Sequence, residues 1–171
     1  MGSDKKKDAK KIKEIKTQVV IFKETIMKIG ENIIPAPIGV KIDPKIGKIM
    51  APIKIAPASD VVLTPKIEKG LLVNEGFVKV KMLFKNPDPE PCPDVRKSIS
   101  KEVVVPIQSV HQIDCLRPGD EVKENAKIET ITVMGIPDNS SPKSTGQKAN
   151  LIIKVVLKIK LTILREQVIP V

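Results

Sequence analysis

The chain has 171 residues, which suits one domain of ordinary size with an extension. Its formal net charge of +10 invites a nucleic-acid interpretation. However, only Arg96, Arg117 and Arg165 among the 30 basic residues are arginines, and tyrosine and tryptophan are absent. Bidentate contacts to phosphate favour arginine, and proteins that bind single-stranded nucleic acid need aromatic side chains on which the bases stack. We therefore expect no specific nucleic-acid binding.

The composition favours an all-β fold. With so few aromatic residues the core must be aliphatic, and its Ile and Val side chains fit pleated sheets better than helices. The 15 prolines and 9 glycines interrupt the chain too often for long helices. We predict an antiparallel β-sandwich with an extended N-terminal arm. The expected divisions are a lysine-rich flexible tail (1–16), an apolar, proline-rich arm (17–49) and a β-sandwich domain (50–171).

The N-terminal sequence does not resemble a signal peptide. The basic stretch 5–16 is followed by no clean apolar run with a small-residue cleavage site, so no classical signal peptide is expected. No apolar stretch reaches the roughly 18 residues of a membrane-spanning helix. We expect a chain made in soluble form that could reach the cell exterior by lysis or a dedicated route.

The arm begins with a short apolar strand candidate at 17–29. An Ile-rich segment follows at 31–55, in which each proline removes a donor from any sheet ladder, as in an edge strand or an extended arm. Its aliphatic side chains require cover. The residues predicted to form an assembly arm are Val19, Ile21, Ile33, Ile34, Ile38, Val40 and Ile42.

Short strands are predicted next at 60–63 and 65–73. Asn74, Glu75 and Gly76 suggest a turn or a bulge, with the glycine at the strained position. Residues 77–84 alternate between apolar and polar side chains and predict another strand. A proline-rich loop follows at 85–93.

The second half of the domain continues the same pattern. Residues 101–107 predict a strand, and 109–116 a short, less regular element. Arg117-Pro118-Gly119-Asp120 has the central residues of a type II turn. A strand is predicted at 126–134 and a flexible polar loop at 135–146.

The stretch 151–164 is the clearest strand in the sequence. From Ile153 the odd positions are apolar, whereas most even positions carry lysine or threonine, so one face suits a core and the other suits water or an acidic partner. The residues predicted to form a lysine face are Lys79, Lys81, Lys154, Lys158 and Lys160.

Catalytic chemistry is poorly supported, and we expect no enzyme and no cofactor. His111 is the only histidine, and its sequence neighbours Ser109 and Asp114 do not predict a catalytic triad. A structural zinc site would have too few ligands. Two acidic groups could bind calcium, although neither follows EF-hand order. They are Asp88, Glu90 and Asp94, and Asp120, Glu121 and Glu124.

The two cysteines, Cys92 and Cys115, lack the close spacing of a metal site. They could be buried or free thiols, or they could form a disulfide within one chain or between chains. In an assembled protein they are candidates for covalent cross-links between subunits.

Three stretches together resemble a known family, the SPOCS domain, a small β module of spore-coat and spore-morphogenesis proteins in endospore-forming Firmicutes. They are IEKGLLVNEGFVKVKMLF (67–84), VVVPIQSVHQIDCLRPGDEVKENAKIETITV (103–133) and the terminal strand (149–164). Asp120 stands where the family usually has Met after the Pro-Gly pair. The resemblance implies a structural or scaffolding part of the spore envelope and supplies no catalytic residues.

Two functions follow as hypotheses. In the first, the protein is a self-assembling subunit of a spore-surface layer or extracellular filament, and its arm adds as a donor strand to a neighbouring sheet edge. Removing residues 1–49 should then leave a soluble monomer. If instead the arm folds back on its own domain, the protein is monomeric.

In the second hypothesis, the protein is a non-polymeric adaptor whose lysine face binds an acidic coat protein or wall polymer, without any membrane span.

Overall fold

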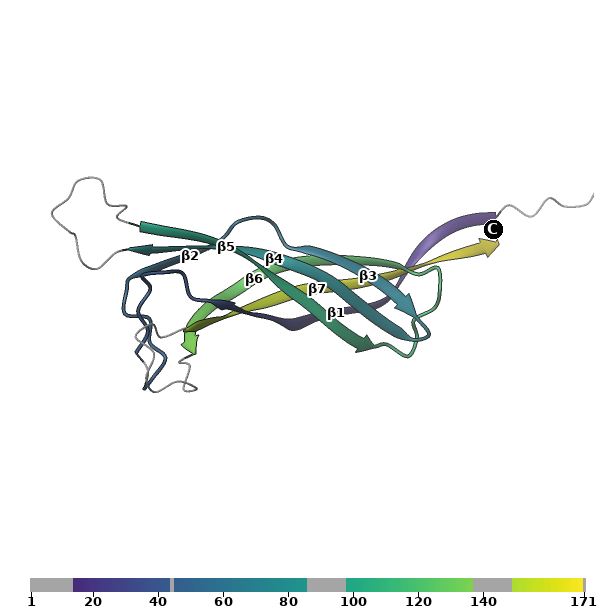
Figure 1. Cartoon of the computed structure of the whole chain (residues 1–171). Coiled ribbons are helices and arrows are strands. Elements are labelled where there is room, and N and C mark those ends of the chain that lie inside the picture. The colour runs from purple at the N-terminus through teal and green to yellow at the C-terminus, as the bar shows by residue number, and fades with distance from the viewer. Residues whose placement is uncertain (1–13, 44, 86–97, 137–148, 171) are drawn as a thin grey trace, which may run out of the picture.

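The computed structural model describes residues 14–43, 45–85, 98–136 and 149–170, and these ranges contain strands and no helix (Figure 1). Two antiparallel sheets pack against each other, so the predicted all-β sandwich is confirmed. The described part of the chain therefore offers no helix capable of crossing a membrane. The strands are β1 (Glu14–Pro35), β2 (Ile53–Pro57), β3 (Val62–Glu68), β4 (Leu71–Lys85), β5 (Ser98–Gln112), β6 (Glu121–Ile136) and β7 (Asn150–Pro170).

The sheets are built around two central strands. In the three-stranded sheet, β7 lies between β1 and β6. In the four-stranded sheet, β4 pairs with β5 on one side and with β2 and β3 on the other. Because β3 pairs with residues 71–77 and β2 with residues 80–84, these two short strands form one interrupted edge.

Alternation in the two central strands creates the core. The odd positions of β7 from Leu151 to Ile163 are all 0% exposed, and the even positions of β4 supply the facing layer. Burying one such aliphatic side chain contributes about 1.5–3 kcal/mol, so β7 contributes a large share of the core. A slip of one residue would move all of these side chains to the solvent face, which fixes the register.

The turn or bulge predicted at residues 74–76 is wrong, because these residues lie inside β4 and the strand pairing continues through them without a register shift. The reversal occurs at Lys69 and Gly70, whose φ angles are 44° and 82°. Gly76 instead allows a close approach, since a Cβ atom there would lie 2.0 Å from the carbonyl oxygen of Val62. The glycine therefore serves packing between β3 and β4, which the local sequence does not reveal.

The predicted arm is an integral strand in this structure. β1 pairs with β7 from Glu14, opposite Pro170, to Pro35, opposite Asn150, so the sandwich begins before the predicted boundary at residue 50. The strand is longer than the predicted 17–29, since no proline interrupts the chain before Pro35. Of the two arrangements expected for the arm, the chain adopts the one in which it folds back on its own domain.

The remaining arm residues differ in their burial. Residues 36–52 connect β1 to β2 and contain an isolated bridge between Ile42 and Ile49. Ile42 is buried, and Ile34 and Val40 pack against the core. Ile33 and Ile38 are exposed.

One side of the sandwich is closed by β1 and β5. The Asn32 side chain donates a hydrogen bond of 2.7 Å to the carbonyl oxygen of Val104. A Cβ atom at Gly30 would lie 2.6 Å from the carbonyl oxygen of Pro106, so this glycine permits the close contact between the strands. The outer edge of β1 is therefore covered in its second half.

Candidate functional site

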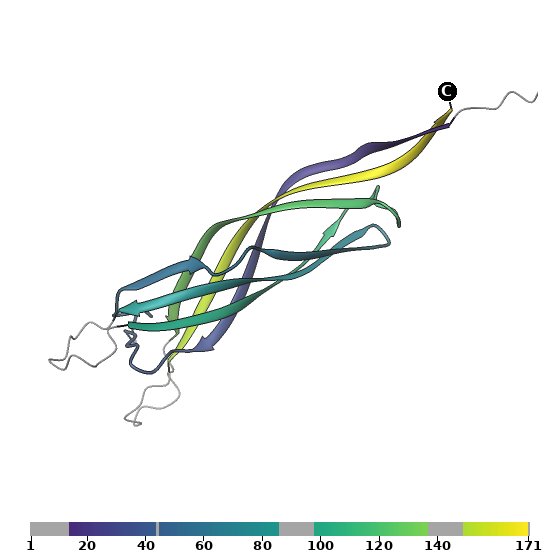
Figure 2. The same ribbon diagram turned by 90° about the horizontal axis from the view of Figure 1, so that it is seen from above.

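The most unusual surface feature is a two-stranded ribbon at one end of the molecule. Residues 14–20 of β1 pair with residues 164–170 of β7, whereas β6 pairs with β7 only as far as Leu164. Figure 2 shows the two strands, in purple and yellow, extending past the other strands. We call residues 14–20 and 165–170 the end ribbon.

The end ribbon leaves sheet edges unpaired on both sides among the residues described. Four of its aliphatic side chains are about half exposed, namely Ile15, Val20, Val168 and Ile169. A two-stranded ribbon is marginally stable alone, and unpaired strand edges are templates for pairing with another chain. This end of the molecule is therefore suited to strand addition.

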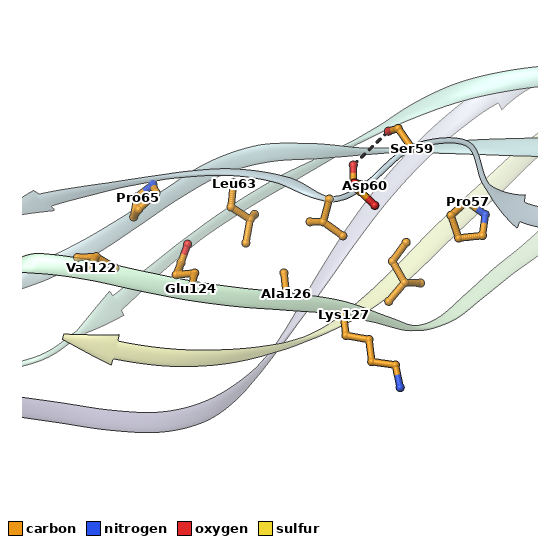
Figure 3. A pocket seen from close by; sticks show the side chains of 11 residues that line it. Pro57, Ser59, Asp60, Leu63, Pro65, Val122, Glu124, Ala126 and Lys127 are labelled. Atoms are coloured by element: carbon orange, nitrogen blue, oxygen red, sulfur yellow. Dashed lines mark hydrogen bonds between the residues drawn. The ribbon is translucent and has the colours of Figure 1, made fainter. Parts of the chain in front are cut away.

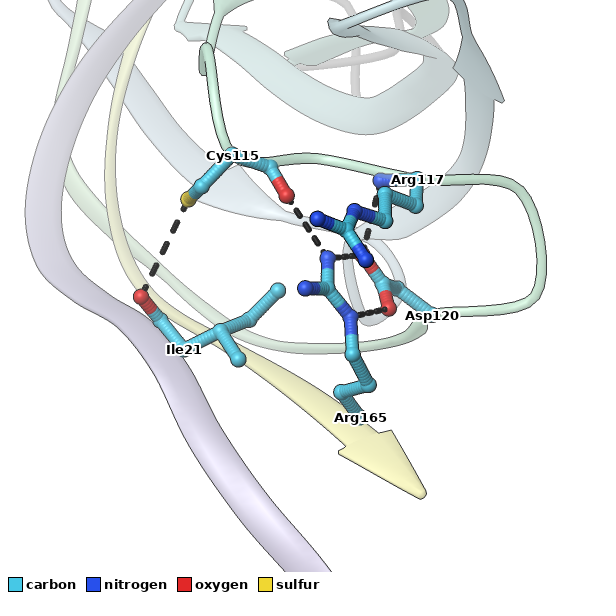
Figure 4. Close-up of polar contacts among 5 residues, drawn as sticks. All are labelled: Ile21, Cys115, Arg117, Asp120 and Arg165. Carbon is cyan, nitrogen blue, oxygen red and sulfur yellow. Dashed lines mark hydrogen bonds and ion pairs between the residues drawn. The ribbon is translucent and has the colours of Figure 1, made fainter. Parts of the chain in front are cut away.

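The loop between β5 and β6 holds the base of the end ribbon (Figure 4). The Arg165 guanidinium donates two hydrogen bonds to the Asp120 carboxylate, at 2.7 and 2.8 Å, and a third to the Cys115 carbonyl oxygen at 2.6 Å. The Asp120 side chain is only 3% exposed and also accepts the backbone N–H of Arg117 at 2.8 Å. Such a bidentate, charge-assisted pair fixes the direction in which β7 leaves the sandwich.

Two local backbone features support this arrangement. The turn predicted at residues 117–120 is present, because the Asp120 N–H reaches the Arg117 carbonyl oxygen at 3.2 Å and Gly119 has a φ angle of 92°. In β1 the register shifts between Val20 and Phe22, so Ile21 is the extra residue of a bulge. The Cys115 thiol lies 3.9 Å from the Ile21 carbonyl oxygen, where it makes a weak hydrogen bond.

Replacing Asp120 by Asn should reduce stability in a pH-dependent way. The hydrogen bonds from Arg165 hold the pKa of the Asp120 carboxyl below its usual range, against the opposing effect of burial. The stabilising contribution is therefore present above the unfolded-state pKa and is lost as pH falls through the folded-state pKa. We expect Asp120→Asn to cost about 1–2 kcal/mol at pH 7, a figure reduced because Arg165 stays partly solvated.

Urea unfolding at neutral pH and again well below the carboxyl pKa checks this expectation, since the difference from the wild type should shrink in acid. Glu166→Gln is the matched control, because the Glu166 pair with Lys16 is exposed and such pairs contribute little. An equal loss at both pH values would contradict the role assigned to the Asp120 carboxylate.

The five lysines of the predicted lysine face do not form one surface. Lys79 and Lys81 point outward from β4, whereas Lys154, Lys158 and Lys160 point outward from β7 in the other sheet. The outer faces of two packed sheets point in opposite directions. Sequence alternation identified the outward positions but could not show which sheet each strand joins.

The outer face of the three-stranded sheet nevertheless gathers lysines that sequence reasoning missed. Lys127 pairs with Lys158, and Lys23 and Lys123 are both paired with Thr162. Lys154 is partly neutralised by Glu31, at 3.2 Å. Lys123 is likewise partly neutralised by Glu121, at 3.3 Å. We call Lys23, Lys123, Lys127, Lys158 and Lys160 the basic face.

A groove of about 620 Å³ lies between the edge strands β3 and β6 (Figure 3). The strand order puts it on the side of the sandwich opposite β1 and β5. Its apolar lining consists of Pro57, Val61, Leu63, Pro65, Val122, Ala126 and Ile128. Prolines interrupt the β2 and β3 edge at Pro57 and Pro65, whereas β6 contains none. β6 is thus the more complete edge for main-chain pairing.

The other predicted site residues are separated in space. Asp120 binds Arg165, Glu121 lies 3.3 Å from Lys123, and Glu124 accepts a hydrogen bond from Asn74. No group of three metal-ligating side chains occurs in the described ranges. The acidic residues Asp88, Glu90 and Asp94 lie outside the described residues.

His111, Ser109 and Asp114 do not form a triad. The His111 Nε2 atom is 3.6 Å from the Glu24 carboxylate, and the Ser109 hydroxyl accepts a hydrogen bond from Lys28. Asp114 accepts a hydrogen bond from Gln112, two residues earlier in the chain.

Whether the two cysteines are thiols or form a disulfide stays a prediction. Cys115 is an exposed thiol, and Cys92 lies outside the described residues.

Comparison with known proteins gives no match to a family model, to a curated protein or to a solved structure. The resemblance to the SPOCS domain therefore rests on the three sequence stretches alone.

Proposed function

We propose that this protein is a structural subunit that assembles with copies of itself by strand pairing. The observation that carries the proposal is the end ribbon, with its unpaired edges and half-exposed aliphatic side chains. The resemblance to the SPOCS domain supports a spore-surface layer or an extracellular filament as the setting. No catalytic step is part of this role.

The donor in this proposal is the end ribbon and not the whole arm. From Phe22 to Pro35, β1 is already paired with β7 and covered by β5, so donating it would expose the core. Beyond Leu164 no backbone pairing joins β6 to the end ribbon, and the Gln18 side chain contacts β6 through a hydrogen bond of 2.7 Å to Glu121. The end ribbon can therefore add to another sheet without unfolding its own subunit. Main-chain hydrogen bonds would supply affinity, and side chains such as Ile15 and Ile169 would set the register.

The acceptor in this proposal is the outer edge of β6 in the next subunit. This strand has no proline between Glu121 and Ile136, and the groove beside it offers apolar side chains. Donor and acceptor are different surfaces, so the contact is heterologous and repeats without closing on itself. A filament is the expected product.

Negative-stain microscopy and size-exclusion mass measurement of the full-length protein test this function. We expect concentration-dependent filaments for the wild type. The double variant Ile15→Lys/Ile169→Lys should stay monomeric at the same concentration, because these residues are directly paired in the end ribbon and lysine on a free edge opposes addition. Val110→Lys is the matched control, since Val110 is an exposed aliphatic residue on β5, away from the end ribbon. Its filaments should persist.

A wild type that remains monomeric at every concentration would overturn the proposal. Filaments that survive in the double variant would show that the end ribbon is not the donor.

A second candidate function rests on the basic face. Its five lysines lie on one sheet surface, which favours an adaptor that binds an acidic coat protein or an anionic wall polymer. The dependence of binding on salt concentration distinguishes the two functions. Lysine-driven binding weakens steeply as screening rises, whereas strand addition does not. A monomer whose binding to a polyanion disappears at high salt would favour the adaptor.

A further inference from the structure

The aliphatic core contains a small cluster of polar side chains. Within the described ranges, Lys28 and Asn74 are the only buried polar or charged residues, at 7% and 0% exposure. Ser109 and Glu124 approach them from other strands, so β1, β4, β5 and β6 each supply one member. Buried polar groups are costly unless they are satisfied, so the cluster calls for a specific reason.

The Lys28 amine contacts Ser109, the residue that is paired with Asn74. Its Nζ atom donates a hydrogen bond to the Ser109 hydroxyl. Ser109 is directly paired with Asn74 in the β4–β5 register, and their side chains share the inner face. Directly paired residues have Cβ atoms about 4.5–5.5 Å apart, which brings the amine close to the Asn74 carboxamide.

Glu124 contacts the same carboxamide from the opposite sheet. Its Oε1 atom accepts a hydrogen bond of 2.5 Å from Asn74 Nδ2. Among the described residues, the Asn74 Oδ1 and Glu124 Oε2 atoms are buried and have no hydrogen-bond partner. The cluster is thus incompletely satisfied as it stands, which a purely structural polar network would not favour.

The lowered pKa of the Lys28 amine suits a nucleophile. Burial lowers the pKa of the Lys28 amine, and the negative charge of Glu124 opposes only part of this change. A larger fraction of the amine is therefore neutral than on the surface, and the neutral amine is the form that attacks carbonyl carbon.

We propose that Lys28, Asn74 and Glu124 form a self-modification site, at which the side chains of Lys28 and Asn74 condense into an amide cross-link. The Lys28 Nζ lone pair attacks Asn74 Cγ, and a new C–N bond forms. The Glu124 carboxylate takes a proton from Nζ and returns it to Nδ2, after which the Cγ–Nδ2 bond breaks and ammonia leaves. The atoms balance without a metal, an oxidant or a cofactor.

The residues have separate roles in this step. Lys28 and Asn74 react, and Glu124 transfers the proton, which is the work of a positioned general acid–base group. Ser109 is a positioning residue, because its hydroxyl holds Nζ next to the carboxamide. The two reacting side chains are buried, which limits the access of bulk water, whereas Glu124 also lines the groove between β3 and β6.

The cross-link would join the edge strand β1 of one sheet to the central strand β4 of the other. It would close a covalent loop through the core and hold β1 in its own chain. This inference stands independently of the proposed filament, since it concerns only contacts inside one subunit.

Intact-mass spectrometry of the purified full-length protein in denaturant tests the cross-link, together with peptide mapping. We expect a mass lower than the formula value by one ammonia, and a branched peptide joining Lys28 to Asn74. Trypsin should fail to cleave after Lys28. The variants Glu124→Ala and Lys28→Arg should have their full formula masses.

Lys23→Arg and Asn125→Ala are matched controls, because these residues lie on β1 and β6 but face outward. Both should keep the loss of ammonia. A wild-type protein of full formula mass after prolonged incubation would overturn the proposal, and this result does not depend on whether any variant folds. Loss of ammonia mapped to a different asparagine would overturn it equally.

Discussion

Deleting residues 1–35 should abolish the soluble monomer. The deletion removes β1, which pairs with β7 over its whole length and closes the sandwich against β5. The inward side chains of β7, from Leu151 to Ile163, would then border an unpaired edge. The expected loss is comparable with the roughly 5–15 kcal/mol that separates folded from unfolded domains. This reverses the expectation from sequence alone that removal of residues 1–49 leaves a soluble monomer.

Solubility and circular dichroism of the truncated chain check the result. Deletion of residues 1–13 alone is the control, and it should leave the sheet signal unchanged. A peptide of residues 14–35 added during refolding should restore soluble protein, because it can pair with β7 as β1 does. A truncated chain that is folded and monomeric without the peptide would show that β1 is dispensable.

The complementation experiment also bears on the core cluster. The added peptide carries Lys28, so the proposed condensation would attach it covalently to Asn74 of the truncated chain. Rescue without covalent attachment would support the strand pairing and count against the cross-link, so the two inferences can fail separately.

Replacing Gly76 by Ala should strongly destabilise the fold. The new Cβ atom would lie 2.0 Å from the Val62 carbonyl oxygen, 2.9 Å from its carbonyl carbon and 3.0 Å from Leu63 Cα. All three are backbone atoms of β3, so no side chain can rotate to relieve the clash. We expect a loss of about 3 kcal/mol or more, since overpacking against backbone requires a strand to move. The unfolding midpoint should fall by about 6–12 °C.

Thermal unfolding followed by circular dichroism measures this effect. Glu75→Ala is the matched control on the adjacent residue, whose side chain is exposed and makes only a long ion pair with Lys66 at 3.5 Å. It should change stability by less than about 0.5 kcal/mol. Equal effects of the two substitutions would show that β3 does not approach Gly76 closely.

Periodicity along the chain was sufficient for β7, the central strand of the three-stranded sheet. Residues 151–164 alternate strongly, and the structure has them inside β7 with the odd positions buried. The Pro-Gly turn at 117–120 was also predictable, because its φ requirement is local. Local rules failed at Gly76, where the reason for glycine is a neighbouring strand distant in sequence.

The candidate sites likewise contain some residues that local sequence patterns predict and others that they do not. The outward lysines of β7 could be read from alternation, but their neighbours Lys23, Lys123 and Lys127 became neighbours only through strand register. The ion pair between Asp120 and Arg165 and the cluster around Asn74 join residues far apart in the chain. Nothing in the spacing of these residues predicts that they meet.

By itself, the sequence determined the fold class and the composition of the core, because aliphatic alternation and frequent prolines act through each residue's immediate neighbours. Only the tertiary structure decided that the N-terminal arm docks on β7, that the lysines face opposite ways, and that Asn74 meets Glu124. These outcomes depend on which strand lies beside which and in what register. Strand order and register are set by packing of the whole chain, so short-range patterns leave them open.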